Sequence, residues 1–165
     1  MLHPNEVVFF DSGTTVQTLA EQLHPESTNT IITASFNTME VLVKLQNCTI
    51  ISTGGVYSPK PKVFFNHNSN DFFKRYRANK AFLGTTGFEL ALGLTCGYTE
   101  DVPMKLAMLE YSKEKILLTD STKFGKVSTC VFGKIEDFTA VITDSGIPDD
   151  YSNYIRSSGV ELIIV

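Results

Sequence analysis

The sequence predicts an α/β fold in which a mainly parallel sheet carries helices on both faces. Short apolar runs alternate along the chain with segments whose apolar residues recur at helical spacing. Strands that alternate with helices form parallel sheets, because each helix carries the chain back across one face of the sheet. The 165 residues show no linker and no internal repeat, so we expect a single domain over 1–165.

The first half of the chain predicts three strands and two helices. The strands are the apolar runs at 7–10, 30–33 and 48–53. Segment 56–70 is mixed and holds two prolines, so we expect a long loop there. Each of the first two strands is followed by apolar residues at the i, i+3, i+4 spacing of an amphipathic helix: Val16, Leu19, Ala20 and Leu23, and then Met39, Leu42 and Val43.

The second half continues the alternation. A helical pattern at 72–80 leads into a short strand at 81–84 and then into a glycine-rich stretch at 84–97. Helical stripes follow at Met104, Ala107, Met108 and Tyr111, and again at Tyr151, Tyr154 and Ile155. The remaining strands are expected at 115–120, 129–135, 140–144 and 161–165.

Composition and charge exclude several classes of protein. The chain is 42% hydrophobic and 19% charged, which is typical of a globular domain and not of a disordered one. No apolar run approaches the roughly 18 residues of a membrane span, and the first residues lack a signal peptide's basic region. Three scattered cysteines indicate buried thiols in a reducing compartment, so a cytoplasmic location is expected.

Sequence motifs give no sign of metal or nucleotide chemistry. His3, His24 and His67 lack the spacing of metal ligands, so we expect no metal. GxSxG, Walker A and GxGxxG motifs are missing, so we expect no cofactor. The net charge of −4 argues against a protein whose main surface binds nucleic acid. The basic residues among aromatics at 60–80 are better explained as the solvated side of a helix, with a subunit contact or a lid as alternatives.

Polar residues recur where the predicted strands end. In an open α/β sheet, ligands bind beyond the carboxyl ends of the strands, where such residues gather. Asp and Ser also favour turns and helix N-caps, and we favour a turn for Asp144, which Gly146 and Pro148 follow. Three strands end in an Asp-Ser dipeptide and two in hydroxyl residues: Asp11-Ser12, Asp120-Ser121, Asp144-Ser145, Ser35 and Ser52-Thr53.

The stretch DSGTT, after the first strand, has the composition of an anion site. Gly13 lets the backbone approach a ligand, and the helix that follows offers unpaired N–H groups and the positive end of its dipole. Thr14, Thr15 and Val16 are mediocre helix formers, so helix stability alone does not explain them. An N-cap role explains Ser12 but not both threonines, and that alternative stays open.

Two further segments are candidates for the same site. In TDSTKFGK, Lys123 follows Asp120 and could supply a point charge to a phosphate, with a solvated loop lysine as the alternative. In YTEDVPMKLAM, Asp101 and Lys105 share one helix face, with a surface ion pair as the alternative.

Seven motifs in this order resemble the effector-binding domain of DeoR-type transcriptional regulators. The resemblance spans about residues 6–165. It implies a Rossmann-type topology like that of ribose-5-phosphate isomerase, glucosamine-6-phosphate deaminase and coenzyme A transferases. The motifs are DSGTT, ITASFN, STGG, AFLGTTG, GLT, an acid four residues before a lysine, and DSTKFG.

The resemblance also implies which residues bind the ligand. The phosphate would lie among the DSGTT residues, with lysines supplying charge and glycines allowing close backbone approach. The acid before the lysine is Asp101 here, where the family usually has glutamate, and Glu100 stands beside it. The implied set is Asp11, Ser12, Gly13, Thr14, Thr15, Ser35, Asn37, Gly54, Gly55, Gly84, Gly87, Asp101, Lys105, Asp120 and Lys123.

The function that the resemblance implies is sensing of a phosphorylated sugar by a bacterial repressor of sugar metabolism. Such regulators carry an N-terminal helix-turn-helix module, which is absent from this chain, so DNA would be bound only through that missing module. A homo-oligomer is expected, and no membrane partner. We expect no enzymatic activity, because the isomerases have an acidic residue where this chain reads GTTG. A sugar-phosphate isomerase-like enzyme and a pure oligomerisation module remain as alternatives.

Overall fold

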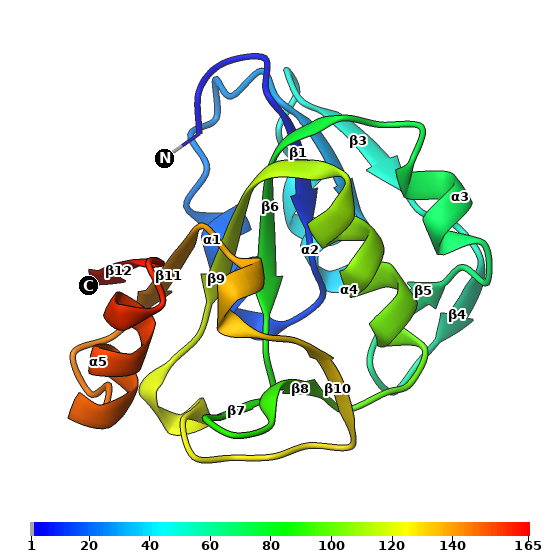
Figure 1. Ribbon diagram of the computed structural model, residues 1–165. Helices are drawn as coiled ribbons and strands as arrows, with labels where there is room; N and C mark the ends of the chain where they lie inside the picture. Colours follow the sequence, from blue (N-terminus) through cyan, green and yellow to red (C-terminus); the bar gives the residue numbers. More distant parts are fainter. Residues whose placement is uncertain (1) are drawn as a thin grey trace.

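The computed structural model describes residues 2–165 and shows one long sheet with helices on both sides (Figure 1). The sheet has seven strands in the order β12-β11-β9-β6-β1-β2-β3, and every pairing within it is parallel. The predicted fold class is therefore confirmed. The strands are β1 Val7–Phe10, β2 Thr30–Thr33, β3 Thr49–Ser52, β6 Ala78–Gly84, β9 Ser112–Leu118, β11 Ala140–Thr143 and β12 Glu161–Ile164.

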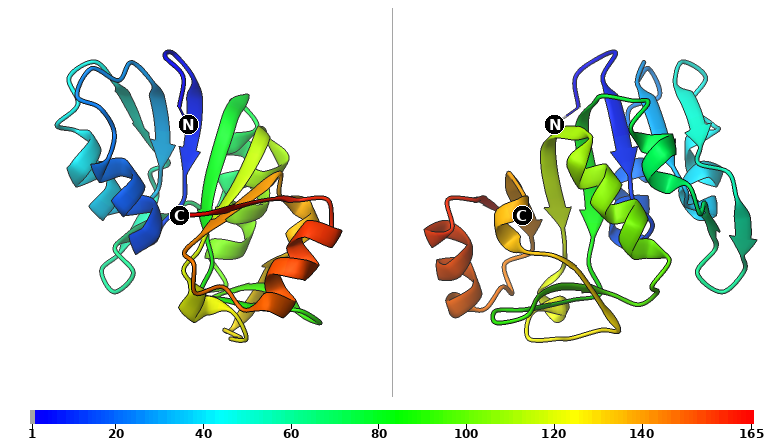
Figure 2. Two further views of the ribbon diagram at one scale, coloured as in Figure 1. Left: turned by 90° about the vertical axis from the view of Figure 1, so that its left-hand side faces the viewer. Right: turned by 45° about the vertical axis from the view of Figure 1, so that its right-hand side comes forward.

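Alternate residues of the central strands enter two apolar cores, one on each face of the sheet. Val8 and Phe10 of β1 pack with the helices α1 and α2 on one face, whereas Phe9 packs with α3, α4 and α5 on the other. Figure 2 shows these two helical layers on opposite sides of the sheet. The helices are α1 Thr14–Glu21, α2 Phe36–Leu42, α3 Ser69–Phe73, α4 Asp101–Glu110 and α5 Asp149–Ser157. No helix within residues 2–165 combines the length and apolar character needed to cross a membrane.

Segment 56–70 is not the long loop that we expected. It holds an antiparallel hairpin, β4 Val56–Ser58 with β5 Val63–Phe65, followed by the start of α3. Tyr57 and Phe64 face each other across the hairpin with ring centroids 5.1 Å apart, a pairing that stabilises antiparallel strands. The two prolines fall between the strands, at 59 and 61, where they remove no hydrogen bond from the ladder.

The helix expected at 72–80 is shorter and starts earlier. It ends at Phe73, and β6 already begins at Ala78, because residues from there on pair with both β1 and β9. Lys80 is buried and donates to Glu6 at 2.5 Å, so it does not belong to a solvated basic face.

The predicted strand at 129–135 lies outside the main sheet. Its ordered part, β10 Cys130–Gly133, pairs antiparallel with β8 Gly93–Cys96, which pairs with β7 Gly87–Glu89. The glycine-rich stretch therefore forms two strands of a second, three-stranded sheet. At Gly87 a Cβ atom would overlap the carbonyl group of Lys126, so a larger residue would push β7 away from the segment that precedes β10. The short helices η1 Ser121–Lys123 and η2 Ile135–Asp137 flank β10 in sequence.

Candidate functional site

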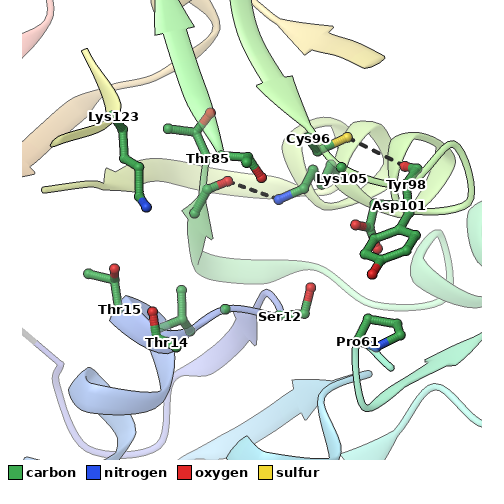
Figure 3. A pocket seen from close by; sticks show the side chains of 15 residues that line it. Ser12, Thr14, Thr15, Pro61, Thr85, Cys96, Tyr98, Asp101, Lys105 and Lys123 are labelled. Atoms are coloured by element: carbon green, nitrogen blue, oxygen red, sulfur yellow. Dashed lines mark hydrogen bonds between the residues drawn. The ribbon is translucent and has the colours of Figure 1, made fainter. Parts of the chain in front are cut away.

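A cavity of about 340 Å³ opens at the carboxyl ends of the two central strands, β1 and β6. The residues around it come from six separate segments, which the sheet and α4 hold together (Figure 3). This is where an open α/β sheet is expected to bind a ligand. The lining residues are Ser12, Gly13, Thr14, Thr15, Val16, Pro61, Gly84, Thr85, Thr86, Cys96, Gly97, Tyr98, Asp101, Lys105 and Lys123.

The start of α1 faces this cavity without a side-chain cap. Gly13 is the N-cap residue, with φ 133° and ψ 154°, a conformation that is essentially restricted to glycine. Among the described residues no side chain accepts a hydrogen bond at this helix start, so the capping role considered for Ser12 is wrong. The first-turn N–H groups and the hydroxyls of Ser12, Thr14 and Thr15 remain available to an anion.

A buried ion pair lies beneath the cavity. The ammonium group of Lys105 donates to the carboxylate of Asp11 and, at 2.9 Å, to the carbonyl oxygen of Gly84. The same Asp11 carboxylate accepts from the Gly84 N–H at 2.9 Å. The Lys105 Nζ atom also lies 4.7 Å from the ring centroid of Phe132. These contacts tie α4 to the ends of β1 and β6 and take up the charge of Lys105 within the protein.

Asp101 lies one helical turn before Lys105 on α4 and is nearly as deeply buried. The side chains of both residues are buried, so the alternative of a surface ion pair is wrong. The Oδ1 atom of Asp101 is buried with no hydrogen-bond partner among the described residues. Burial, and then the charge of Asp11, raise the pKa of the Asp101 carboxyl to about 6, although Lys105 acts in the opposite direction.

Lys123 approaches the cavity from the opposite side to Asp101. It ends η1, and its Nζ atom lies 4.0 Å from the carboxylate of Asp120. Asp120 itself caps η1 by accepting from the N–H of Thr122 at 3.0 Å. Lys123 thus lines the cavity, whereas Asp120 shapes the turn that carries it.

The turn that we favoured for Asp144 is confirmed. Its carboxylate accepts from the N–H groups of Ser121 at 2.7 Å and Gly146 at 2.8 Å. These backbone hydrogen bonds, the one from Ser121 first, hold the pKa of the Asp144 carboxyl below its ordinary value.

Several residues that the resemblance implied for the site lie away from the cavity. Ser35 caps α2 by accepting from Thr38 N–H at 3.2 Å, and Asn37 lines a separate groove on α2. A Cβ atom at Gly55 would overlap the carbonyl of Phe65, so the close approach there is to the hairpin. Gly54, Gly87 and Asp120 do not border the cavity either, whereas Asp11 lies directly below it.

The cavity also contains residues that sequence reasoning missed. Thr85 and Thr86 stood inside the quoted GTTG motif and could have been found there. Cys96 and Tyr98 lie at the end of β8 in the second sheet, and Pro61 lies at the tip of the hairpin. These residues are near the cavity only because of the tertiary fold.

Burial raises the pKa of the Cys96 thiol to about 11, which keeps it protonated and weakly reactive at neutral pH. In the part of the chain that the structure describes, no three His, Cys, Asp or Glu side chains are grouped to hold a metal ion.

Comparison with known protein families gives one match that covers most of the chain. Residues 1–145 match the model of the family described as the DeoR C terminal sensor domain. The matched range includes β1, β6, α4 and η1, the elements that surround the cavity.

The curated relatives are transcriptional regulators and are longer than this chain. The regulator IolR of Bacillus subtilis is 30% identical over 93% of this chain and 61% of its own length. The deoxyribose operon repressor of Escherichia coli is 26% identical over 99% of this chain and 65% of its own length. An uncharacterized HTH-type transcriptional regulator of Haemophilus influenzae is 28% identical, and the chain spans 64% of it. The chain thus spans under two thirds of the length of each.

Solved structures share the fold at low sequence identity. Ribose 5 phosphate isomerase A from Neisseria gonorrhoeae aligns with 77% of this chain and 48% of its own, at a TM-score of 0.51 and 14% identity. The eIF2B beta subunit from Chaetomium thermophilum aligns with 78% of this chain and 37% of its own, at a TM-score of 0.54 and 18% identity. These likenesses confirm the isomerase-like topology that the sequence predicted, and nothing beyond the fold.

Proposed function

Because this chain belongs to the DeoR C-terminal sensor domain family, we propose that its cavity binds a phosphorylated sugar and thereby controls a bacterial repressor of sugar metabolism. The observation that carries the proposal is the uncapped start of α1, which faces the cavity with three hydroxyl side chains and has Lys123 on the same side.

A phosphate group suits this end of the cavity for physical reasons. The N–H groups of a helix start and the positive end of the helix dipole favour an anion. The hydroxyls of Ser12, Thr14 and Thr15 add donors for its oxygens, and Lys123 adds a compensating charge. Gly13 has no side chain that would stand between the backbone and the ligand, and the space around its missing Cβ atom is open to 4 Å.

In the proposed mechanism the ligand acts by shifting a conformational equilibrium. A ligand changes the population of two states only by as much as its affinity for them differs. The relatives are HTH-type regulators, and this chain matches under two thirds of their length, so the DNA-binding module belongs to the remaining part of the protein in this proposal. We propose a homo-oligomer in which an occupied cavity favours one arrangement of the subunits.

We propose that the domain is a sensor and not an isomerase. Aldose–ketose isomerisation needs positioned acid–base groups. At the GTTG segment the chain has no carboxylate, and the Thr85 hydroxyl already donates to the carbonyl oxygen of Gly87 at 2.7 Å. The relatives named here are regulators, which also favours sensing.

Thermal melting against a ligand panel tests the proposal. The panel holds sugar phosphates of three to six carbons, the matching unphosphorylated sugars and inorganic phosphate. A ligand at about 100 times its dissociation constant should stabilise the folded protein by roughly 2.7 kcal/mol, which is a clear shift. The proposal expects a phosphorylated sugar to stabilise and its unphosphorylated form not to.

Two results would contradict this function. Stabilisation by unphosphorylated sugars alone would refute the phosphate site. Turnover of the stabilising compound, followed by NMR of the mixture, would show an enzyme instead of a pure sensor.

A further inference from the structure

The cavity has two ends with opposite electrostatic character. Figure 3 shows Lys123, Thr14 and Thr15 on one side, and Asp101 with Tyr98 and Pro61 on the other. The first side is positive through Lys123 and the start of α1, whereas the second presents a carboxylate.

The protein compensates the charge of the Asp101 carboxylate only in part, because burial and Asp11 raise its pKa more than Lys105 lowers it. Only 7% of the residue is exposed, and its Oδ1 atom has no partner among the described residues. Lys105, the cation that lowers the pKa of Asp101, already donates to the Asp11 carboxylate and the Gly84 carbonyl oxygen. Lys105 therefore forms its ion pair with Asp11, and Asp101 forms none among the described residues. Buried polar groups are normally paired, and of Asp11 and Asp101, which each have a buried oxygen unpaired among the described residues, only Asp101 lines the cavity. A carboxylate in that position indicates a ligand that donates to it.

A role in helix stability does not account for this arrangement. An acidic residue in the first turn of α4 interacts favourably with the helix dipole, but it does not have to be buried for this interaction. Glu100, one residue earlier, is exposed and meets that need without the cost of burial.

We infer that Asp101 determines which phosphorylated ligands the cavity accepts: it binds hydroxyl groups at the end remote from the phosphate and excludes a second negative charge there. This inference rests on the proposed phosphate site. A hydroxyl can donate to the Asp101 carboxylate, whereas a carboxylate placed against Asp101 meets like charge in a poorly solvated place. The cavity thus separates sugar and polyol phosphates from phosphorylated sugar acids.

Two pairs of probes test this inference, because each pair differs only at the remote end. Sorbitol 6-phosphate and 6-phosphogluconate exchange a terminal CH₂OH for a carboxylate, and so do glycerol 3-phosphate and 3-phosphoglycerate. Isothermal titration calorimetry at pH 7.5 gives the ratio of the two affinities in each pair. Inorganic phosphate serves as the probe of the phosphate end alone. We expect the wild-type protein to prefer the alcohol by about tenfold or more.

Asp101→Asn keeps the size of the side chain and removes its charge. We expect it to lower the preference for the alcohol by about tenfold, chiefly because the acid binds more tightly. A gain of affinity cannot come from a damaged fold, so this outcome is distinct from misfolding. Glu100→Gln removes the same charge from the adjacent exposed position and should leave the preference unchanged.

The pH dependence of the preference for the alcohol over the acid gives a second test. Both members of a pair carry the same phosphate, so its titration cancels in their ratio. The preference should weaken between pH 7 and pH 5 as Asp101, whose pKa is raised to about 6, becomes protonated. Asp101→Asn should remove this dependence. The charged and titratable groups that surround Asp101 are Asp11, Lys105, Glu100, Cys96 and Tyr98.

The outcomes separate the two proposals. Binding of an alcohol with the same preference in wild type and in Asp101→Asn overturns this inference and leaves the phosphate site standing. A wild-type preference for the acid overturns it as well. If none of the five probes binds, the phosphate site itself is refuted and the inference falls with it.

Discussion

Breaking the ion pair beneath the cavity with a single substitution should destabilise the protein strongly. Lys105→Met keeps most of the length of the side chain and leaves the carboxylate of Asp11 buried without a cation. The side chains of Asp11 and Lys105 are 0% and 4% exposed, so water cannot replace the lost partner.

The expected loss in free energy of unfolding follows from the burial of both side chains. Removing one member of a buried pair costs about 3–5 kcal/mol, because a charge stays behind without compensation. The Gly84 N–H still donates to Asp11, which favours the lower end of the range. For a domain of this size each kcal/mol lowers the melting temperature by about 2–4 °C, so we expect a loss of roughly 6–12 °C.

Urea denaturation of four proteins measures this effect. They are the wild type, Lys105→Met, Asp11→Asn and the double variant, whose neutral pair should recover about 1–3 kcal/mol relative to the sum of the single changes. Lys74→Met is the control, because Lys74 pairs with Asp71 on the exposed surface and its loss should cost under about 0.5 kcal/mol. The reasoning is refuted if Lys105→Met costs no more than Lys74→Met, or if the double variant is additive.

Three further results are expected. Because the pKa of Asp101 is raised from 3.8 to about 6, the folded protein binds more protons than the unfolded chain in that window, and its stability falls as pH rises through it. Asp101→Asn should therefore raise the free energy of unfolding at pH 7 by about 1–3 kcal/mol in urea denaturation, and no gain would contradict the burial of a charge. Thr14→Val should lower the affinity for a stabilising sugar phosphate by about tenfold, and Lys123→Met should lower it by more, as measured by calorimetry. Thr18→Val, one turn along α1 and outside the cavity, should leave the affinity unchanged. Gly13→Ala should cost about 1–3 kcal/mol in urea denaturation through backbone strain alone, since no atom lies within 4 Å of the added carbon; a cost under about 0.5 kcal/mol would contradict that view.

The parallel sheet could be predicted because its signals are local. Each strand is a short apolar run, and each of α1, α4 and α5 has apolar residues at helical spacing. The hairpin and the second sheet could not be predicted in the same way. The prolines at 59 and 61 do lie in a turn, but that turn joins the two strands of a hairpin. Gly87 lies inside a strand of the second sheet, where a glycine read locally would indicate a turn.

The cavity was predictable where its residues follow the strands of the main sheet. The segments after β1 and β6 both reach it, as do Asp101, Lys105 and Lys123. Ser35 follows β2 and caps a helix, whereas Gly55 follows β3 and allows a close contact with the hairpin. Neither residue lines the cavity. In the sheet, β2 and β3 lie on the other side of β1 from β6, whereas the cavity opens at the ends of β1 and β6. The order of the strands in the sequence does not by itself give their order in the sheet.

Asp11 and Lys105, which touch below the cavity, are 94 residues apart in the sequence. Closing so long a stretch of chain costs entropy before any contact compensates for it, so we expect the folding steps that depend on it to come late. The cavity therefore exists only when β1, β6, α4 and η1 have all assembled, and a fragment that lacks any of them has no binding site. A ligand bound there can stabilise only the complete domain, which makes ligand-dependent protection from proteolysis a measure of how much of a preparation is fully folded.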